Sequence, residues 1–429
     1  MNQRRRFLRN AGAYSLSAIA GRLILPEVAN DLVHHVRRIE SMPLDTQIKD
    51  EAFWESVKQA YTVSPTIMNL NNGGVSPQPR VVQEAVERYN KLSNEAPSYY
   101  MWRILDKGRE PLRSRVADLA GCSAEEIAFN RNTSEALETI IFGLRLEAGD
   151  EVVLSKLDYP NMMNAWRQRE HRDGIVLKWI EPEFPMESDE EIIRLYTDQF
   201  TDKTRIVHLT HMVNWMGQVI PVKKIADAAH ERGIEVVVDG AHSFAHLDFE
   251  IRDLNCDYFG TSLHKWLCAP FGSGLIYVRK EKIKSLYPLL AAPDPEEEDI
   301  RKFEHLGTRS FAIEQAIGQA LDFHLMIGPE RKAERLWMLK NYWCERVSEL
   351  NNVSIGTSLN RDYGGAIALL RIEGQSPQDV GNALMNDHGI HTVSIDYFNV
   401  QGVRITPNVY TLTSDLDRLV GAIKEIAGA

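Results

Sequence analysis

A lysine in this sequence lies between a short β-rich run and a glycine-rich turn. In Thr261-Ser262-Leu263-His264-Lys265-Trp266, a hydroxyl and an imidazole flank the Lys265 amine, and Gly272-Ser273-Gly274 follows. A lysine amine that is desolvated enough to lose its proton is a nucleophile that forms Schiff bases with carbonyl compounds. Taken alone, a lysine after a histidine is more often a solvated surface residue.

An acid occupies the corresponding place one strand earlier. Asp239-Gly240-Ala241-His242 begins where the most hydrophobic predicted strand ends. Ligands of open α/β sheets bind beyond the carboxyl ends of the strands. A buried carboxylate there can keep a pyridine nitrogen protonated, as pyridoxal 5'-phosphate (PLP) chemistry requires. Asp239 could also simply end a strand in a turn, but Asp239 and Lys265 together are more specific than either residue alone.

A third segment has the features of a phosphate site. Asn130-Arg131-Asn132-Thr133-Ser134-Glu135 follows a predicted strand and precedes a helix expected to open at Ala136. The N–H groups of a helix N-terminus and two hydroxyls would suit a phosphate. The alternative is a plain N-cap formed by Ser134.

The elements that must position these residues alternate in type. Short apolar runs separated by amphipathic stretches, such as Val222–Arg232 with Gly233 after it, predict an α/β fold with a large, doubly wound, mainly parallel sheet. The expected strands are Ile127–Phe129, Glu151–Ser155, Ile175–Ile180, Arg205–Thr210, Ile234–Asp239, Asp257–Gly260 and Gly274–Arg279.

The order of predicted helices and strands changes after the Pro-rich, acidic run at 291–299. The elements expected after this run predict a smaller α+β domain. They are a helical region over Ser310–Asn351, a segment Ala366–Glu373, a helix Pro377–His388, strands His391–Ser394 and Val403–Thr406, and a helix from Asp415. We expect residues 76–299 to form the large PLP-binding domain, and residues 45–75 and 300–429 to form the small one.

The overall composition excludes several function classes. A net charge of -11 and a pI of about 5.7 argue against nucleic acid as a partner. The four cysteines lack the CxxC spacing of a thiolate zinc site. The histidines at 208, 211, 242, 246 and 264 could suggest a zinc hydrolase, but residues three apart on a strand face opposite sides of the sheet. We therefore expect no metal.

The first 30 residues resemble an export signal. Gln3-Arg4-Arg5-Arg6-Phe7-Leu8-Arg9 followed by an apolar run predicts a twin-arginine leader and a periplasmic protein without membrane insertion. The alternative is a basic amphipathic N-terminus on a cytoplasmic protein.

Taken together, the motifs resemble one family. Five segments are similar to the class V aminotransferases. They are Asn132-Thr133-Ser134-Glu135, His211 to Gly217, Asp239-Gly240-Ala241-His242, Ser262-Leu263-His264-Lys265 and Gly307-Thr308-Arg309. The likeness runs from Leu70-Asn71-Asn72-Gly73-Gly74 to Arg404, and it is strongest to the isopenicillin N epimerase-like branch. The leader is similar to that of a periplasmic member that tailors the siderophore pyoverdine.

The resemblance implies the fold of PLP-dependent transferases of fold type I and a role for each matching residue. Lys265 would carry PLP as a Schiff base and act as the general base, and Asp239 would pair with the ring nitrogen. Asn132 would lie in the cofactor site, and Thr133, Ser134, Ser262 and His264 would hold the phosphate. Asn214 and His242 would lie near the ring oxygen, and Tyr159 would stack on the ring. Asn72, Gly73 and Arg404 would bind substrate, with Arg404 on its carboxylate, and Thr308 would reach the phosphate of the other subunit of a homodimer.

One departure from the family limits the reactions that the enzyme is expected to catalyse. Cysteine desulfurases need a cysteine on a mobile loop, and the matching stretch 391–399 contains none. The sequence therefore predicts transamination or epimerisation of an amino acid or an amino-acid-bearing peptide. A β- or γ-lyase and a non-catalytic PLP-fold binding protein remain alternatives.

Overall fold

The larger part of the molecule is built on a seven-stranded sheet. The computed structural model describes residues 26–428, with side chains from Leu32 onward. The strand order is β2-β8-β7-β6-β5-β3-β4. Strands β3 to β7 run parallel, and β8 is antiparallel to its neighbours β7 and β2. The bounds are β2 Ile127–Asn130, β3 Glu151–Ser155, β4 Val176–Ile180, β5 Thr204–Thr210, β6 Glu235–Asp239, β7 Tyr258–Ser262 and β8 Gly274–Val278. The predicted mainly parallel sheet is confirmed.

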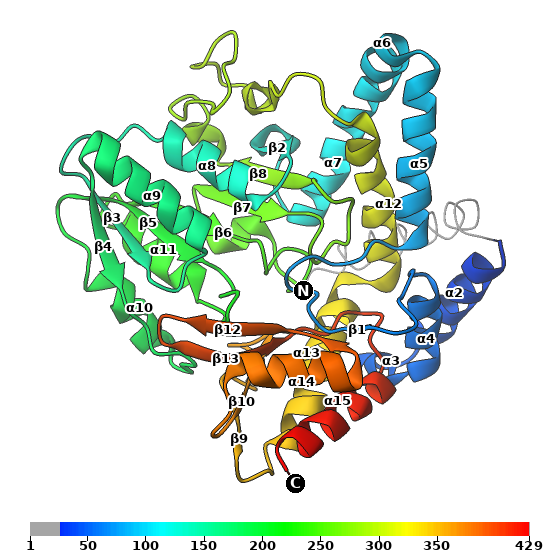
Figure 1. Cartoon of the computed structure of the whole chain (residues 1–429). Helices are drawn as coiled ribbons and strands as arrows, with labels where there is room; N and C mark the ends of the chain where they lie inside the picture. The colour runs from blue at the N-terminus through cyan, green and yellow to red at the C-terminus, as the bar shows by residue number, and fades with distance from the viewer. Residues whose placement is uncertain (1–25, 429) are drawn as a thin grey trace.

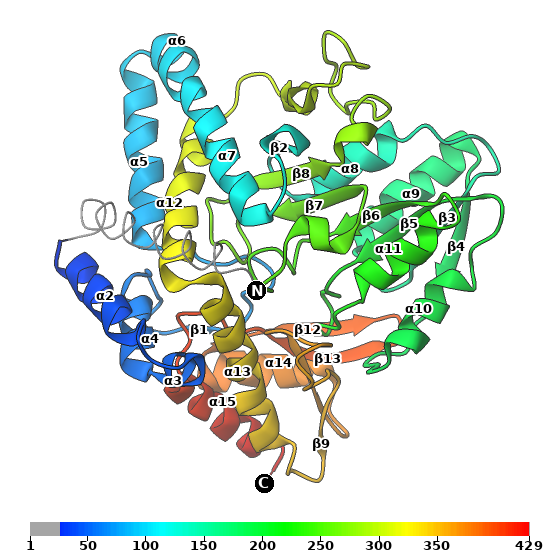
Figure 2. The same ribbon diagram turned by 180° about the vertical axis from the view of Figure 1, so that it is seen from behind.

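Helices cover both faces of this sheet because successive side chains of its strands point to opposite sides. Val237 packs into a core with helices α8 (Thr133–Gly143) and α9 (Pro160–Asp173). Its neighbours Val236 and Val238 pack into a second core, with α7 (Arg109–Ala120), α10 (Asp189–Thr197) and α11 (Val222–His230). This arrangement is the doubly wound fold expected from the sequence, and Figures 1 and 2 show it from two sides.

A smaller sheet lies beneath the large one (Figure 1). It is antiparallel, with the order β12-β13-β10-β9. Its elements are β9 Val353–Ile355, β10 Ala368–Ile372, β12 Val393–Tyr397 and β13 Val400–Ile405, together with helices α13 Pro329–Val347, α14 Pro377–His388 and α15 Thr413–Ile426. A short parallel pair, β1 (Met68–Asn69) and β11 (Ile390–His391), connects the N-terminal part of the chain with the small sheet region. These segments give the α+β character predicted for the C-terminal part.

The structure refines two expectations for the C-terminal part. The helical region expected over Ser310–Asn351 consists of two helices, α12 (Phe311–Ile327) and α13, which are separated at Gly328. Gly328 has φ +90, and Pro329, which has no N–H to donate, opens the next helix. The strands expected at His391–Ser394 and Val403–Thr406 are longer, because β12 and β13 pair as one hairpin up to Tyr397 and Val400.

The N-terminal segment forms helices on one side of the molecule (Figure 1): α2 (Pro26–Ile39), α3 (Leu44–Lys49), α4 (Glu51–Gln59) and α5 (Arg80–Glu95). Helix α12 packs along α5, so the first helix after residue 300 contacts the region predicted to be the large domain. The twin-arginine motif at Gln3–Arg9 lies outside the described residues. Among residues 26–428, no helix is both long and apolar enough to cross a membrane.

Candidate active site

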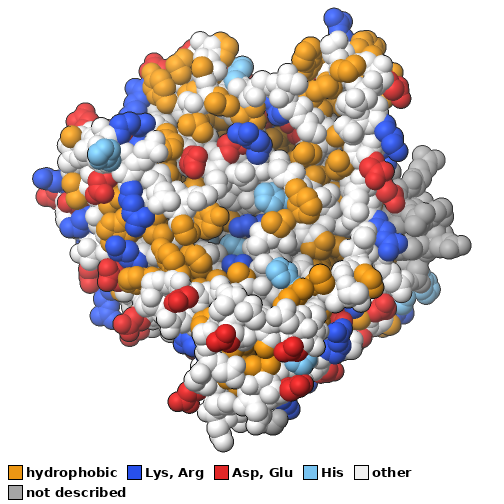
Figure 3. Space-filling model, viewed as in Figure 1, with side chains coloured by type: hydrophobic (Ala, Val, Ile, Leu, Met, Phe, Trp, Pro, Cys, Tyr) orange, Lys and Arg blue, Asp and Glu red, His pale blue; other side chains and the backbone are white. Residues whose placement is uncertain are grey.

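The chemistry-bearing segments meet at one edge of the large sheet. Strands β2, β3, β5, β6 and β7 all run in the same direction, so their carboxyl ends lie side by side. The residues at or just beyond these ends are, in turn, Asn132 and Thr133, Tyr159, His211 and Asn214, Asp239 and His242, and Lys265. This edge is where ligands of such sheets bind. Figure 3 shows histidine and basic side chains gathered at the centre of the corresponding face, between hydrophobic side chains.

Lys265 lies between an acid and an imidazole. Its Nζ is 3.2 Å from Nε2 of His242, and its charge interacts with Asp239. Asp239 is buried and accepts the Ala241 N–H at 2.9 Å. Gly240 allows this turn to lie against β7, because a Cβ at this position would be only 1.8 Å from Cζ of Phe259. The predicted pair of Lys265 and Asp239 is therefore brought together in one site.

Burial sets the protonation of these groups. It lowers the pKa of Lys265 to about 8, which Asp239 opposes and the Arg404 charge reinforces. It also raises the pKa of Asp239, against the Ala241 N–H and the Lys265 charge, and holds the pKa of His242 well below its ordinary value. A lysine with such a lowered pKa has a substantial free-base population near neutral pH, as a Schiff-base lysine needs.

The predicted phosphate residues also converge. Oγ of Ser262 accepts the Thr133 N–H at 2.9 Å and lies 2.7 Å from the Thr133 hydroxyl. His264 bonds the Ser273 carbonyl through Nδ1 at 3.0 Å. Helix α8 begins at Thr133, earlier than the expected Ala136, and its N-cap is Asn132 rather than Ser134, because the Asn132 side chain accepts the Glu135 N–H. Ser134 consequently lies in the first helical turn, where anions are stabilised.

Arg404 is a buried cation whose partners are neutral. It projects from β13 and donates to the Asn214 carbonyl at 2.9 Å and to Oδ1 of Asn71 at 3.0 Å. Burial lowers its pKa to about 10, and the nearby Tyr159 opposes the shift, so the guanidinium stays charged at neutral pH. A buried charge normally has an ionic partner. A carboxylate ligand would supply one in the bidentate geometry that arginine favours.

The remaining predicted residues differ in their burial, their contacts and their proximity to the site. The Asn72 amide is saturated within the protein, by bonds to Asn69, Thr406 and Tyr410. Gly73 lies beside the site, since a Cβ on it would be 3.7 Å from the His242 ring. Tyr159 is 40% exposed at the start of α9, and Thr308 is exposed.

Sequence reasoning missed three contributors to the site. Asn71 contacts Arg404, although the prediction named its neighbour Asn72. Trp266 donates to His242, and its only signal was its place directly after Lys265. Asp158 accepts bonds from Ser155 and Thr210, and its pKa is raised to about 7 by burial, opposed by those bonds and reinforced by Asp239.

Several buried polar atoms at this edge have no hydrogen-bond partner within the described chain. They are Oδ1 of Asn214, Nδ1 of His211 and Nε of Arg404. Native proteins pair nearly all such atoms, so a polar ligand is the natural partner. Together with the Thr133 and Ser262 hydroxyls, Asp239 and Lys265, they fit the ring nitrogen, ring oxygen, aldehyde and phosphate of PLP.

The two histidines three residues apart on β5 and just beyond it lie on opposite faces of the sheet. His208 accepts the Trp166 indole N–H on one face of the sheet, whereas His211 packs edge-on against Phe249 on the other. Across residues 26–428, no group of three or more ligating side chains gathers.

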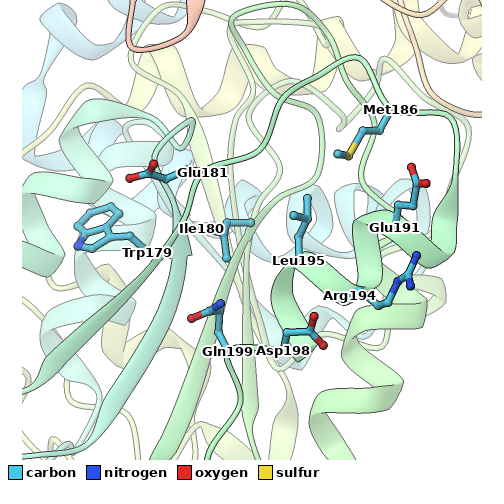
Figure 4. A pocket seen from close by; sticks show the side chains of 9 residues that line it. All are labelled: Trp179, Ile180, Glu181, Met186, Glu191, Arg194, Leu195, Asp198 and Gln199. Atoms are coloured by element: carbon cyan, nitrogen blue, oxygen red, sulfur yellow. The ribbon is translucent and has the colours of Figure 1, made fainter.

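A separate surface pocket of about 660 Å³ lies between β4 and α10 (Figure 4). None of the residues that line it belongs to the site described above. They are Trp179, Ile180, Glu181, Met186, Glu191, Arg194, Leu195, Asp198 and Gln199.

Comparison with known proteins agrees with this geometry. The chain is 27% identical over 393 residues to isopenicillin N epimerase of Amycolatopsis lactamdurans, covering 87% of this chain and 98% of that protein. It is 26% identical over 393 residues to a cysteine desulfurase of Haloferax volcanii, covering 83% and 88%. The fold matches the apo cysteine desulfurase of Thermococcus onnurineus with a TM-score of 0.76 at 23% identity, covering 87% and 98%. The model of the family described as aminotransferase class V matches residues 68–419. The chain therefore belongs to the class V aminotransferase family and is a PLP-dependent enzyme.

Proposed function

We propose that this enzyme rearranges bonds at the α-carbon of an amino acid, or of a peptide bearing a free amino-acid group, by transamination or epimerisation. The observation that carries the proposal is Arg404, a buried guanidinium with neutral partners at the same sheet edge as Lys265 and Asp239. The isopenicillin N epimerases among its relatives support an α-carbon reaction.

Each residue of the site would have a different role in the reaction. PLP, when bound, withdraws electrons from the substrate α-carbon and so acidifies its proton. The Lys265 amine would hold the cofactor, and its Nζ would take and return the α-proton of the substrate. Asp239 would keep a proton at the ring nitrogen, and Arg404 would orient the substrate carboxylate. Trp215, next to Asn214, stacks on Tyr397 with ring centroids 4.4 Å apart.

A desulfurase or lyase that uses a protein thiol is less compatible with these side chains. Burial raises the pKa of three of the four cysteines, Cys122 to about 12 and also Cys256 and Cys344, whereas a nucleophilic thiol needs a lowered pKa. The fourth, Cys268, is buried. In the stretch matching the desulfurase loop, Ser394 bonds the Pro377 carbonyl and Tyr397 stacks on Trp215. These contacts favour a fixed hairpin over a mobile nucleophile.

The reaction type is tested with a panel of L-amino acids and the PLP-loaded enzyme in deuterated water. Ketoacid formation identifies transamination, and deuterium at the α-carbon without net turnover identifies epimerisation. Ammonia release with pyruvate would instead assign a lyase. Absence of all three, with PLP bound, would support a binding protein and overturn the proposal.

Arg404→Lys should raise KM for carboxylate-bearing substrates about 30- to 100-fold, because lysine cannot form the paired bonds of a guanidinium. Steady-state kinetics measure this change, with Arg172→Lys, at an exposed position, as the matched control. An unchanged KM would remove Arg404 from substrate binding.

Capture of free PLP should become faster as the pH rises through about 8. Only the unprotonated Lys265 amine attacks the aldehyde, and its pKa is about 8; below that value the rate should rise about tenfold per pH unit, and above it the rate should level off. Stopped-flow visible absorbance follows the capture, with N-acetyl-lysine amide, whose midpoint is near 10.4, as the reference. A flat profile from pH 6.5 to 9 would contradict the assignment.

The proposal includes a homodimer in which Thr308 contributes to the neighbouring site. Thr308 is exposed, and so are the large apolar side chains Trp102 and Phe271, at 56% and 53%. Light scattering should give twice the 48.8 kDa chain mass, and a monomeric holoenzyme would refute the dimer.

The proposal also includes export by the twin-arginine route, supported by the motif at Gln3–Arg9. Replacing Arg4 and Arg5 with Lys should leave the enzyme in the cytoplasm upon cell fractionation, whereas an unchanged distribution would favour the cytoplasmic alternative.

A further inference from the structure

His242 lies between two side chains from the lysine-bearing loop. Its Nε2 is 3.2 Å from Nζ of Lys265, and its Nδ1 accepts the indole N–H of Trp266 at 3.4 Å. Trp266 is fully buried and His242 is buried. Both ring nitrogens of His242 therefore have a single, defined neighbour.

These neighbours determine where the imidazole carries its proton. An indole N–H can only donate, so Nδ1 must offer its lone pair. A neutral imidazole has one lone pair and one N–H, which leaves the proton on Nε2, facing Lys265. An Nε2–H group accommodates a free amine, which can accept the bond, but not an ammonium group, which has only donors.

A second histidine fixes Trp266 in place. The His246 ring stacks on the Trp266 indole with centroids 3.7 Å apart. Nδ1 of His246 lies 2.8 Å from the His242 carbonyl, and its Nε2 accepts the Ala366 N–H at 2.9 Å. A Cβ on the neighbouring Gly365 would be 2.7 Å from that Nε2. Rotation of the indole away from His242 would therefore break its stacking on His246, whose Nε2 is held by Ala366 just before β10.

The charged and titratable groups around His242 and Lys265 are consistent with a neutral imidazole and a neutral amine. Asp239, His264 and Arg404 interact electrostatically with Lys265, and Lys265, His246 and Arg404 with His242. Burial lowers the pKa of His246 to about 3 and keeps the pKa of His242 well below its ordinary value. Asp239 is the single acid among these neighbours.

We propose that Trp266 is a positioning residue that fixes His242 as a neutral imidazole with its proton on Nε2, so that His242 donates to the Lys265 nitrogen and favours the unprotonated amine. The proposal rests on the assigned role of Lys265 and extends it to a residue that touches neither cofactor nor substrate.

The first test reads the tautomer directly in the cofactor-free protein. Nitrogen chemical shifts of histidine-labelled enzyme, with the His242 signals assigned by their loss in His242→Phe, should show a protonated Nε2 and an unprotonated Nδ1 from pH 6 to 9. The reverse tautomer, or an imidazolium, would overturn the proposal. This outcome is independent of whether Lys265 captures PLP, which tests the proposed function.

The second test uses the pH midpoint of PLP capture, followed by visible absorbance. Trp266→Phe should raise the midpoint by about one pH unit, because His242 can then accept from the ammonium form, and so slow capture at pH 7 about tenfold. In a His242→Phe background the same substitution should leave the midpoint unchanged. His242→Gln should keep a near-wild-type midpoint, because Trp266 can hold the amide oxygen and leave the NH₂ group facing Lys265.

Equal shifts in both backgrounds would reduce Trp266 to a packing residue and refute the proposal. Circular dichroism checks the fold of each variant. If Trp266→Phe does not fold, the tautomer measured in the wild-type protein still decides the question.

Discussion

Lys265→Ala should lower turnover on the order of 10⁴-fold or more, because it removes the nucleophile and the α-carbon base in one step. The structure supports a loss of turnover of this size, since the Lys265 amine lies beside both Asp239 and His242. The visible absorbance of the covalently held cofactor should disappear, while PLP should still bind noncovalently through the other residues. Dialysis followed by absorbance and activity measurements checks both effects.

The matched control is Lys280→Ala, at an exposed lysine. It should retain wild-type turnover and absorbance. Substantial activity in Lys265→Ala, or an equal loss in Lys280→Ala, would contradict the role of Lys265.

Asp239→Asn should lower kcat/KM by about 10²- to 10⁴-fold and leave the covalent link intact. Asparagine preserves the shape and the Ala241 N–H bond, but it cannot keep a proton at the ring nitrogen, so the ring loses electron-withdrawing power. Steady-state kinetics and the absorbance spectrum separate the two properties.

Asp257→Asn provides the control for burial. Asp257 is another buried acid, placed at the opposite end of the sheet, where it accepts the Val236 N–H at 2.8 Å. Its substitution should lower the thermal unfolding temperature with little change in kcat/KM. If Asp239→Asn behaved in the same way, Asp239 would be a structural acid only.

The sequence was sufficient to predict which residues meet, because parallel strands bring their carboxyl ends to one edge. Asp239 and Ser262 end their strands, and Thr133 and Lys265 lie just beyond such an end, so their convergence needed only the strand assignment. The division of the helical region Ser310–Asn351 into two helices coincides with the glycine–proline pair Gly328-Pro329 in the sequence.

Other features depend on contacts between segments remote in sequence and have no local signature. Asn71 meets Arg404 from the other end of the chain, and nothing distinguishes it in the sequence from Asn72, which turns inward. The proton position on His242 depends on Trp266, whose ring is held by His246 and, through it, by Ala366. The extent of the β12–β13 hairpin likewise depends on packing of Tyr397 against Trp215.

Reduction of the PLP-loaded enzyme with borohydride, followed by peptide mapping, tests the central claim most directly. Burial also lowers the pKa of Lys332 and of Lys340 to about 8, so the chain offers competing amines of similar basicity. We predict a phosphopyridoxyl group on Lys265 and on neither of those two. A label on Lys332 or Lys340, or no fixed label at all, would contradict the account.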